Sequence, residues 1–559
     1  MTEPGLRADP QLAASYRAAG WWGDDTVAAV VARHAAMRPD DVAFIADGRR
    51  STWAGYHRDS DRIARVLLAG DHPSGARVAV LLPDGPAVHA AFVGIEKAGL
   101  VTVGIGARAG DREIAHLLTL TGAEVLITTP DQQGRDIDTM LADLGALGAT
   151  VARVVLVDRG GAVVDTGLGG DTVVDDDAPL RPLDADALFL LNSTSGTTGL
   201  PKCVMHTQNR WFHFHQLAAA AGGFGPDEVF LGALPAPFGF GLWTAHFTPA
   251  ILGCPVVVME RFDAEAALDL IERERVTVLC CVSTQFIMML NAQAERPRDL
   301  SSLRAMFTGG EAVPFERAAE FERATGAKVL QFYGSNETGA LSHTSHATDR
   351  DTRLRTAGHV IAEMQVRLLD PATLQDVAPG VDEGQPACRG PATALGYWGD
   401  ERANAALFTE DGWMLMGDIV RIDAEGVLTV IGRTSDFIIR GGKNISAPAV
   451  EAEVATHPAV AMVAAVAWPD PVFGERVCAY VELRSGASLT LEELAAHLRE
   501  RSVSREWWPE HLVVVDTLPR SSGGKVAKGD LRADAQRRSA QFHGETDAGD
   551  PGDERVTSR

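Results

Sequence analysis

The sequence lacks several patterns that would place it in other classes of protein. Its six cysteines form no CxxC pair and no zinc-like spacing, which favours buried, reduced thiols. No apolar run approaches the roughly 20 residues that a bilayer-spanning helix needs. The first ten residues are polar and lack the pattern of a signal peptide. We therefore expect a cytoplasmic protein without membrane insertion.

Positive charge is also scarce. The 559 residues carry a net charge of −24, and this field disfavours nucleic acid and anionic lipid as partners. An anionic small molecule remains compatible, because a local site can supply its own positive charge. The length exceeds what one hydrophobic core usually supports, which indicates at least two domains.

Lysine is scarce among the basic residues, most of which are arginine. Only six of the 51 basic residues are lysine, namely Lys97, Lys202, Lys328, Lys443, Lys525 and Lys528. Three of them, Lys202, Lys443 and Lys525, lie in glycine-rich segments. A compact ammonium meets a phosphate oxygen end-on in a way that a planar guanidinium does not. These three lysines are therefore candidates for phosphate or carboxylate contacts.

Short apolar runs alternate with helical stretches from about residue 60 to 430. This pattern predicts an α/β fold, with parallel sheets flanked by helices in a large N-terminal domain. Helices thin out between about 357 and 432, which indicates a β-rich lobe. A small mobile α/β domain is expected over 434–535 after a large domain over 1–433. The polar residues 536–559 are expected to form a disordered tail.

Small hydroxyl residues and glycines are concentrated in one loop, Ser193 to Lys202, which reads STSGTTGLPK. The loop follows the apolar run ALFLLN and precedes a helical stretch. Successive backbone N–H groups, hydroxyls and one ammonium suit a phosphate group. Leu200 and Pro201 separate Gly199 from Lys202, so the loop is not a Walker motif. A flexible linker is the alternative, but linkers do not stand between a buried strand and a helix.

This loop resembles the phosphate loop of the adenylate-forming superfamily, which includes acyl-CoA synthetases, adenylation domains of peptide synthetases and luciferases. Five further segments resemble the family's motifs in the family's order: TGGEAVP (308–314), YGSNETG (333–339), WMLMGD (413–418), GRTSDFIIRGGKNISAPAVE (432–451) and LPRSSGGKVAKGDL (518–531). Together the six segments span residues 193 to 531. The resemblance implies an AMP-forming acyl-CoA ligase that uses ATP, Mg²⁺ and, as co-substrate, coenzyme A.

The resemblance also implies the roles of individual residues. Lys525 and Glu337 are the implied catalytic residues; Glu337 also holds Mg²⁺, and Lys525 meets the α-phosphate and the attacking carboxylate. Tyr333 stacks on adenine, and Asp418 takes the ribose hydroxyls beside Arg433. The remaining implied ATP-binding residues are Ser193, Thr194, Ser195, Gly196, Thr197, Thr198, Gly199, Lys202, Gly309, Gly310, Glu311, Gly334, Asn336 and Thr338.

Transfer to a thiol requires the small domain to swing in this family. The hinge position is Ser435, where Asp or Lys is usual, and the following Asp436 is the substitute candidate. Gly441, Gly442 and Lys443 are expected along the pantetheine channel, since glycine permits close approach. A second departure is Asn336, which stands where Thr is common but still donates a hydrogen bond.

The acid-binding segment LPAPFGFGLW (234–243) predicts a pocket of Phe238, Gly239, Phe240 and Trp243. Amino-acid-activating members place Asp where this chain has Gly239, and aryl-acid members tend to place Asn there. A buried ammonium without a carboxylate would be costly, which disfavours amino acids and, less strongly, hydroxybenzoates. The aromatics suggest an apolar acid, and Gly239 leaves room for bulk.

Three alternatives stay open at this point. A stand-alone enzyme that loads a carrier protein uses the same pantetheine thiol, and a luciferase-like oxygenase shares the motifs. A non-catalytic acyl-nucleotide sensor is disfavoured by the intact set Lys202, Glu337, Asp418, Arg433 and Lys525. The histidines 206, 213 and 215 are interpreted as ordinary helix residues rather than a metal cluster, because positions i and i+2 do not share a helix face.

Overall fold

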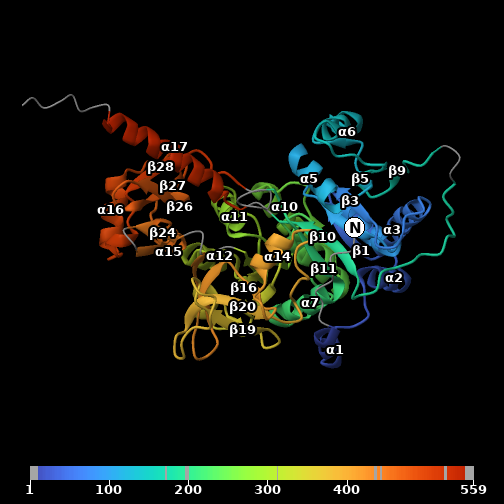
Figure 1. Ribbon diagram of the computed structural model, residues 1–559, viewed down its shortest axis with the longest axis horizontal. Helices are drawn as coiled ribbons and strands as arrows, with labels where there is room; N and C mark the ends of the chain where they lie inside the picture. The colour runs from blue at the N-terminus through green and yellow to red at the C-terminus, as the bar shows by residue number, and fades with distance from the viewer. Residues whose placement is uncertain are drawn as a thin grey trace, which may run out of the picture. The chain divides into compact units, whose positions relative to one another are not determined.

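The computed structural model describes residues 10–169, 173–194, 200–310, 313–433, 437–440, 443–520 and 525–547. The described chain divides into two compact units, one mainly of residues up to 430 and the other mainly of residues from 431 onward. Residues 417–419 group with the second unit. The expected domain boundary was 433/434. Figure 1 shows the two units by colour, the second in orange and red.

The first unit contains two large, mostly parallel sheets. One has seven strands in the order β11 (Cys203–Thr207), β10 (Leu188–Ser193), β4 (Val101–Gly104), β3 (Arg77–Leu81), β5 (Val125–Thr128), β8 (Arg153–Val157) and β9 (Val163–Asp165). The other has nine in the order β18 (His359–Val360), β17 (Gly339–His343), β16 (Lys328–Ser335), β15 (Ala305–Gly309), β14 (Val278–Cys280), β12 (Phe230–Gly232), β13 (Val256–Val258), β1 (Val42–Ala46) and β2 (Arg49–Thr52).

Central strands of both sheets are buried, because helices cover the parallel sheets and exclude water from their apolar runs. The helices of this unit are α1 (Pro10–Ala18), α2 (Val27–Met37), α3 (Trp53–Leu68), α4 (Pro86–Lys97), α5 (Asp111–Thr121), α6 (Ile137–Ala146), α7 (Gln208–Gly222), α8 (Gly239–Gly241), the π-helix η1 (Leu242–Phe247), α9 (Thr248–Leu252), α10 (Ala264–Glu274), α11 (Ser283–Glu295), α12 (Phe315–Thr325), α13 (Arg350–Arg355) and α14 (Glu401–Leu407). The small hairpin β6 (Asp131–Gln132) and β7 (Arg135–Asp136) stands apart from the large sheets.

The expected β-rich lobe is a five-stranded sheet. Its order is β19 (Gln365–Leu369), β20 (Glu383–Arg389), β22 (Asp418–Ile422) and β23 (Leu428–Arg433), and β21 (Met414–Leu415) pairs with β20. The predicted α/β class with a β-rich lobe and a C-terminal domain is therefore confirmed.

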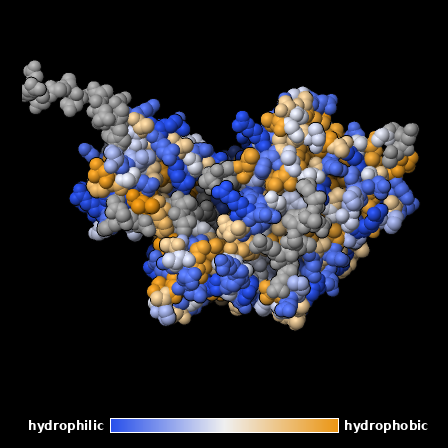
Figure 2. Space-filling model, viewed as in Figure 1, coloured by the Kyte–Doolittle hydropathy of each residue, from blue (hydrophilic) through white to orange (hydrophobic). Residues whose placement is uncertain are grey.

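The second unit builds a sheet in the order β25 (Lys443–Ser446), β24 (Phe437–Arg440), β27 (Gly474–Leu483) and β26 (Val460–Asp470), with β28 (His511–Val515) paired to β27. Its helices are α15 (Ala447–Val454), α16 (Leu491–Glu500), the short 3₁₀ helix η2 (Arg505–Trp507) and α17 (Lys528–Asp547). Figure 2 shows hydrophilic and hydrophobic residues interspersed on the visible face. No helix in the described part of the chain has the length and apolarity to cross a bilayer.

Helix α17 corrects the expectation of a disordered tail from residue 536. The helix runs to Asp547, and its inner face is anchored on the sheet of the second unit as far as Ser539. Leu531 and Ala535 are buried, Tyr480 donates to Asp534, and the Ser539 hydroxyl donates to the Pro469 carbonyl. Polarity alone therefore misjudged this segment; residues 548–559 lie outside the described structure.

Candidate active site

The two ends of the predicted phosphate loop are held together by the β10–β11 hairpin. The Thr194 N–H donates to the Lys202 carbonyl at 2.9 Å, and the Lys202 N–H donates to the Thr194 hydroxyl at 3.3 Å. Residues 195–199, which include Ser195, Gly196, Thr197, Thr198 and Gly199, lie outside the described residues. The hairpin therefore holds Thr194 and Lys202, the residues on either side of 195–199, next to each other.

Lys202 and Glu337 are linked through a residue that sequence analysis missed. The Lys202 ammonium lies 4.7 Å from the centroid of the Tyr397 ring, and the Tyr397 hydroxyl donates to Glu337 Oε1 at 2.7 Å. Burial and the neighbouring Glu337 carboxylate raise the pKa of Tyr397, which keeps its hydroxyl protonated as a donor. The Glu337 carbonyl accepts from the Ala394 N–H at 2.7 Å. One segment, which contains Ala394 and Tyr397 and lies about 60 positions away in the sequence, thus holds the glutamate.

Glu337 suits the predicted Mg²⁺. Tyr397 occupies Oε1, and no hydrogen bond to Oε2 occurs among the described residues. Glu337 is partly exposed, and a carboxylate oxygen is the hard ligand that Mg²⁺ prefers. When bound, the cation would neutralise charge on the phosphates.

Asn336 stands at the centre of a hydrogen-bonded network. Its amide pairs reciprocally with that of Asn192: Asn336 Nδ2 donates to Asn192 Oδ1 at 2.8 Å, and Asn192 Nδ2 donates to Asn336 Oδ1 at 3.2 Å. Asn192 also contacts His206 through Oδ1 and donates to the Pro237 carbonyl at 3.2 Å. The network therefore joins β10, β11, the turn after β16 and the acid-binding segment.

Arg210, at the start of α7, closes the network on its buried side. Its Nη1 contacts His206 Nδ1 and donates to the Asn336 carbonyl at 2.9 Å, while its Nε donates to the Ala392 carbonyl at 2.7 Å. Burial lowers the pKa of Arg210 to about 9, so the guanidinium is charged at neutral pH. Burial, with the Arg210 cation beside it, lowers the pKa of His206 well below its usual value. The imidazole is therefore neutral.

The predicted adenine-side and turn residues occupy adjacent strands. Gly309 ends β15, Gly310 follows at φ +77°, and Tyr333 and Gly334 lie on β16. A Cβ at Gly334 would approach the Gly339 carbonyl oxygen to 1.8 Å, so the turn between β16 and β17 requires glycine. Thr338 is buried, and its hydroxyl accepts a hydrogen bond from the Ser335 N–H within the same turn.

The acid-binding segment packs against this network. A Cβ at Gly239 would lie 2.7 Å from Asn336 Oδ1, so the amide fills the space that the sequence suggested for a bulky acid. Phe240 is partly exposed and contacts the buried Trp243 edge-on, with ring centroids 5.3 Å apart. Trp243 in turn contacts Phe214 and Phe332. Phe238 is partly exposed and packs over Gly106.

Of the remaining predicted residues, Ser193 ends β10 in the first unit and is buried. The others belong to the second unit or lie outside the described residues. Asp418 opens β22 and groups with the second unit, as does Lys525, which precedes the isolated bridge between Arg520 and Val526. Arg433 ends β23 and Lys443 begins β25. Glu311, Ser435, Asp436, Gly441 and Gly442 lie outside the described residues.

Sequence reasoning therefore missed Asn192, His206, Arg210 and Tyr397. Asn192 carried a signal, since an amide ends the otherwise apolar run before the phosphate loop. His206 was expected on a helix but lies on strand β11, where it faces Asn192. In the part of the chain that the structure describes, no three His, Cys, Asp or Glu side chains are grouped to hold a metal ion.

Comparison with known proteins agrees with this geometry. The profile of the AMP-binding enzyme family matches residues 31–398, and that of the AMP-binding enzyme C-terminal domain matches residues 449–525. The chain is 31% identical to the medium-chain fatty-acid–CoA ligase of Escherichia coli, over 96% of this chain and 95% of that one. It is 32% identical to the salicyl-AMP ligase / salicyl-S-ArCP synthetase of Mycobacterium tuberculosis, over 92% of each.

Among solved structures, ATP-bound MatB from Rhodopseudomonas palustris superimposes with a TM-score of 0.79 at 26% identity, covering 92% of this chain and 99% of that one. These findings confirm the predicted resemblance, the use of ATP and an AMP-forming acyl-CoA ligase. The chain therefore belongs to the AMP-binding enzyme family, in its acyl-CoA synthetase branch.

Proposed function

We propose that the protein activates a hydrophobic carboxylic acid as its acyl-adenylate and transfers the acyl group to coenzyme A. In the first step a carboxylate oxygen attacks the α-phosphorus of ATP, and pyrophosphate leaves. In the second step the thiol sulfur attacks the acyl carbonyl carbon, AMP leaves, and the thiol proton passes to solvent. Both steps depend chiefly on positioning and charge stabilisation.

The observation that carries the acid class is the junction at Gly239. A Cβ at Gly239 would lie close to Asn336 Oδ1 and 3.6 Å from the Trp211 ring, and the next residue, the partly exposed Phe240, contacts Trp243. Segment 234–243 contains no acidic residue. Asp84 reaches it through a hydrogen bond from the Ala236 N–H, but burial raises the pKa of Asp84 to about 8. The protein without bound acid therefore presents a neutral carboxyl at Asp84 and no ready-made anion for an α-ammonium group.

Pyrophosphate exchange over a panel of acids tests this class. Apolar aliphatic, alicyclic or aryl acids should support exchange, and amino acids should stay at background. Lys525→Ala should lower adenylation by about 10²-fold or more, because one electrostatic contact to developing charge is worth that order. Supplied with synthetic acyl-adenylate, the variant should form thioester near the parent rate. Robust exchange with an α-amino acid would contradict the proposal.

Coenzyme A is favoured over a carrier protein by a patch of the second unit. The Arg440 and Arg476 guanidinium groups lie 5.4 and 4.7 Å from the centroid of the Phe473 ring, and Phe473 is 40% exposed. Arg476 also pairs with Asp470 and Glu510. An exposed ring flanked by cations suits a purine nucleotide with phosphates.

The thiol acceptor can be tested at this patch without changing the adenylation step. Phe473→Ala should raise KM for coenzyme A about tenfold and leave KM for pantetheine, which lacks the nucleotide, unchanged. If Phe473→Ala instead lost activity with a purified carrier protein and kept it with coenzyme A, the second candidate would be favoured, a carrier-loading enzyme like the mycobacterial relative.

Glu337→Gln is expected to weaken the response to Mg²⁺, measured as the Mg²⁺ concentration at half-maximal exchange.

A further inference from the structure

The network behind Asn336 has a fixed direction. Arg210 only donates, so His206 Nδ1 must accept and the imidazole proton must lie on Nε2. His206 Nε2 then donates to Asn192, whose contacting atom is the carbonyl oxygen Oδ1. The Asn192 amide nitrogen faces the Pro237 carbonyl, an acceptor, which fixes the same orientation independently. No rotation of either amide by 180° preserves all of these bonds.

The series of oriented hydrogen bonds ends at Asn336, the exposed end of the network. Asn192, His206 and Arg210 are buried, whereas Asn336 is partly exposed. Asn192 accepts one N–H of the Asn336 amide and donates to its Oδ1. The second N–H of Asn336 Nδ2 is therefore the group that the network leaves for a ligand. Arg210 additionally holds the Asn336 carbonyl, which fixes the backbone of the same residue.

We propose that Arg210, His206 and Asn192 form a directional hydrogen-bond relay that positions the Asn336 amide to donate its free N–H to a phosphoryl oxygen during adenylation. The three are positioning residues, and Asn336 is the residue that touches the nucleotide. The inference rests on the proposed function, since it assigns a role within the first half-reaction. None of the three relay side chains is a carboxylate, so the relay adds no negative charge beside the phosphates.

A threonine at position 336 would break the dependence on Asn192. Its hydroxyl donates to a phosphoryl oxygen but is too short to pair with the Asn192 amide, so its direction is set locally. The test is a double-mutant cycle of Asn192→Ala and Asn336→Thr. In the parent, Asn192→Ala should lower kcat for pyrophosphate exchange about 20-fold and change KM for the acid less than threefold. In the Asn336→Thr background the same change should cost less than threefold.

Asn209 provides the matched control. It is another buried asparagine, and it precedes Arg210 in α7. Its side chain donates to Asp186 and accepts from the Gly23 N–H, and neither partner belongs to the relay. Asn209→Ala should lower the melting temperature but lower exchange by the same factor in both backgrounds. Asn192→Asp keeps the size and the acceptor for His206 but cannot donate, and it should impair exchange at least as much as Asn192→Ala.

Two outcomes would overturn the relay: equal losses from Asn192→Ala in both backgrounds, or parent-like exchange in Asn192→Asp. If the parent shows no pyrophosphate exchange with any acid of the panel, the proposed function fails. The double-mutant cycle is then repeated with the Kd for ATP with Mg²⁺, measured by calorimetry. Coupling between Asn192 and Asn336 in that affinity would still support the relay. Independent losses would contradict it.

Discussion

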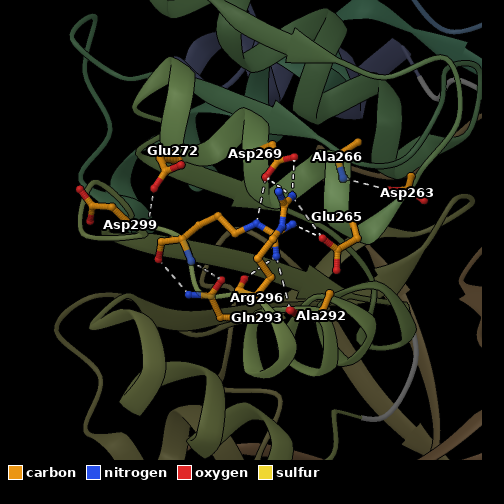
Figure 3. A network of polar contacts seen from close by, with 10 residues as sticks. Asp263, Glu265, Ala266, Asp269, Glu272, Ala292, Gln293, Arg296 and Asp299 are labelled. Atoms are coloured by element: carbon orange, nitrogen blue, oxygen red, sulfur yellow. Dashed lines mark hydrogen bonds and ion pairs between the residues drawn. The ribbon is translucent and has the colours of Figure 1, made fainter. Parts of the chain in front are cut away.

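Two arginine-centred networks in the first unit differ in what surrounds the guanidinium. Arg296 and Arg298 bind the carboxylates of Glu265 and Asp269 near the C-terminal end of α11, as Figure 3 shows for the labelled members. These carboxylates are 46% and 44% exposed. Arg210 is buried, and its acceptors are an imidazole and two carbonyl oxygens, none of them charged.

The difference teaches that the number of ion pairs is a poor guide to importance. Water and salt screen the carboxylates on α10, and ordering long side chains offsets much of the Coulomb gain. Around Arg210 no water replaces the guanidinium if it is lost, so each buried acceptor is left unsatisfied. The network with no ion pair among the described residues should therefore be the more sensitive one.

The largest effect is expected from Arg210→Met. The substitution keeps an apolar stem of similar length but removes the donors to His206, Asn336 and Ala392. We expect the rate of pyrophosphate exchange to fall about 10²-fold and the free energy of unfolding to fall by about 3 kcal/mol. Exchange kinetics and urea unfolding measure the two. Arg210→Lys should be intermediate, and a well-folded Arg210→Met enzyme with parent-like exchange would refute the contrast.

The next effect concerns a carboxyl that is buried without a cation. Asp84 accepts from the Ala236 N–H, and the facing group His89 Nε2 lies 3.8 Å away. Burial raises the pKa of Asp84 to about 8 and lowers the pKa of His89 and of the adjacent His246, so both imidazoles are neutral at neutral pH. By contrast, hydrogen bonds from Arg298 and then Arg296 lower the pKa of Asp269.

The sign of the pH dependence follows from the raised pKa. The folded state keeps the Asp84 proton that the unfolded chain releases near pH 4, so stability is lost as pH rises from about 4 to 8. Asp84→Asn keeps the acceptor for Ala236 and cannot ionise. Between pH 6 and 8 the parent should lose about 2 kcal/mol more unfolding free energy than the variant. Parallel pH profiles of the two proteins, measured by urea unfolding, would contradict this.

A smaller effect is expected from Arg298→Met. The side chain is only 3% exposed, but its partners Glu265 and Asp269 reach water and remain solvated when the cation is lost. The unfolding free energy should fall by about 1 kcal/mol, less at high salt, and exchange should stay at the parent rate. A loss as large as that of Arg210→Met would show that burial of the cation matters more than exposure of its partners.

Sequence reasoning succeeded where neighbours along the chain decide the structure. The apolar runs predicted the strands. The site roles that the motifs imply for Lys202, Glu337 and Asn336 stay predictions. Sequence reasoning could not pair Asn192 with Asn336, because hydrogen bonds between residues 144 positions apart depend on how β10 and β16 are brought together. Likewise, the space beside Gly239 was misjudged because Asn336, which fills it, is distant in sequence.

The C-terminal segment shows the same limit in a helix. The polar composition after residue 536 predicted disorder, but the spacing of Leu531, Ala535 and Ser539 puts one face of α17 against β26. One buried residue in every four is a weak sequence signal for a packed helix when charged residues surround it. Long-range packing, rather than local composition, determines this element and the relay behind Asn336.

The smallest effect, and the sharpest end of the comparison, is Arg296→Ala. The Arg296 side chain is 60% exposed, and its single atom Nη2 donates to both oxygens of Asp269, at 2.7 and 2.8 Å (Figure 3). Arg298 still binds the same carboxylate after the substitution. We therefore expect the unfolding free energy to change by less than about 0.5 kcal/mol, with no effect on exchange. The lowered pKa of Asp269 stabilises the folded state at pH values above the pKa of this group in the unfolded chain. Any residual loss should therefore vanish as the pH falls below the pKa of Asp269 in the folded state. Urea unfolding at two pH values measures this, and a loss above 1 kcal/mol would mean that the contact of Arg296 with both carboxylate oxygens outweighs its exposure.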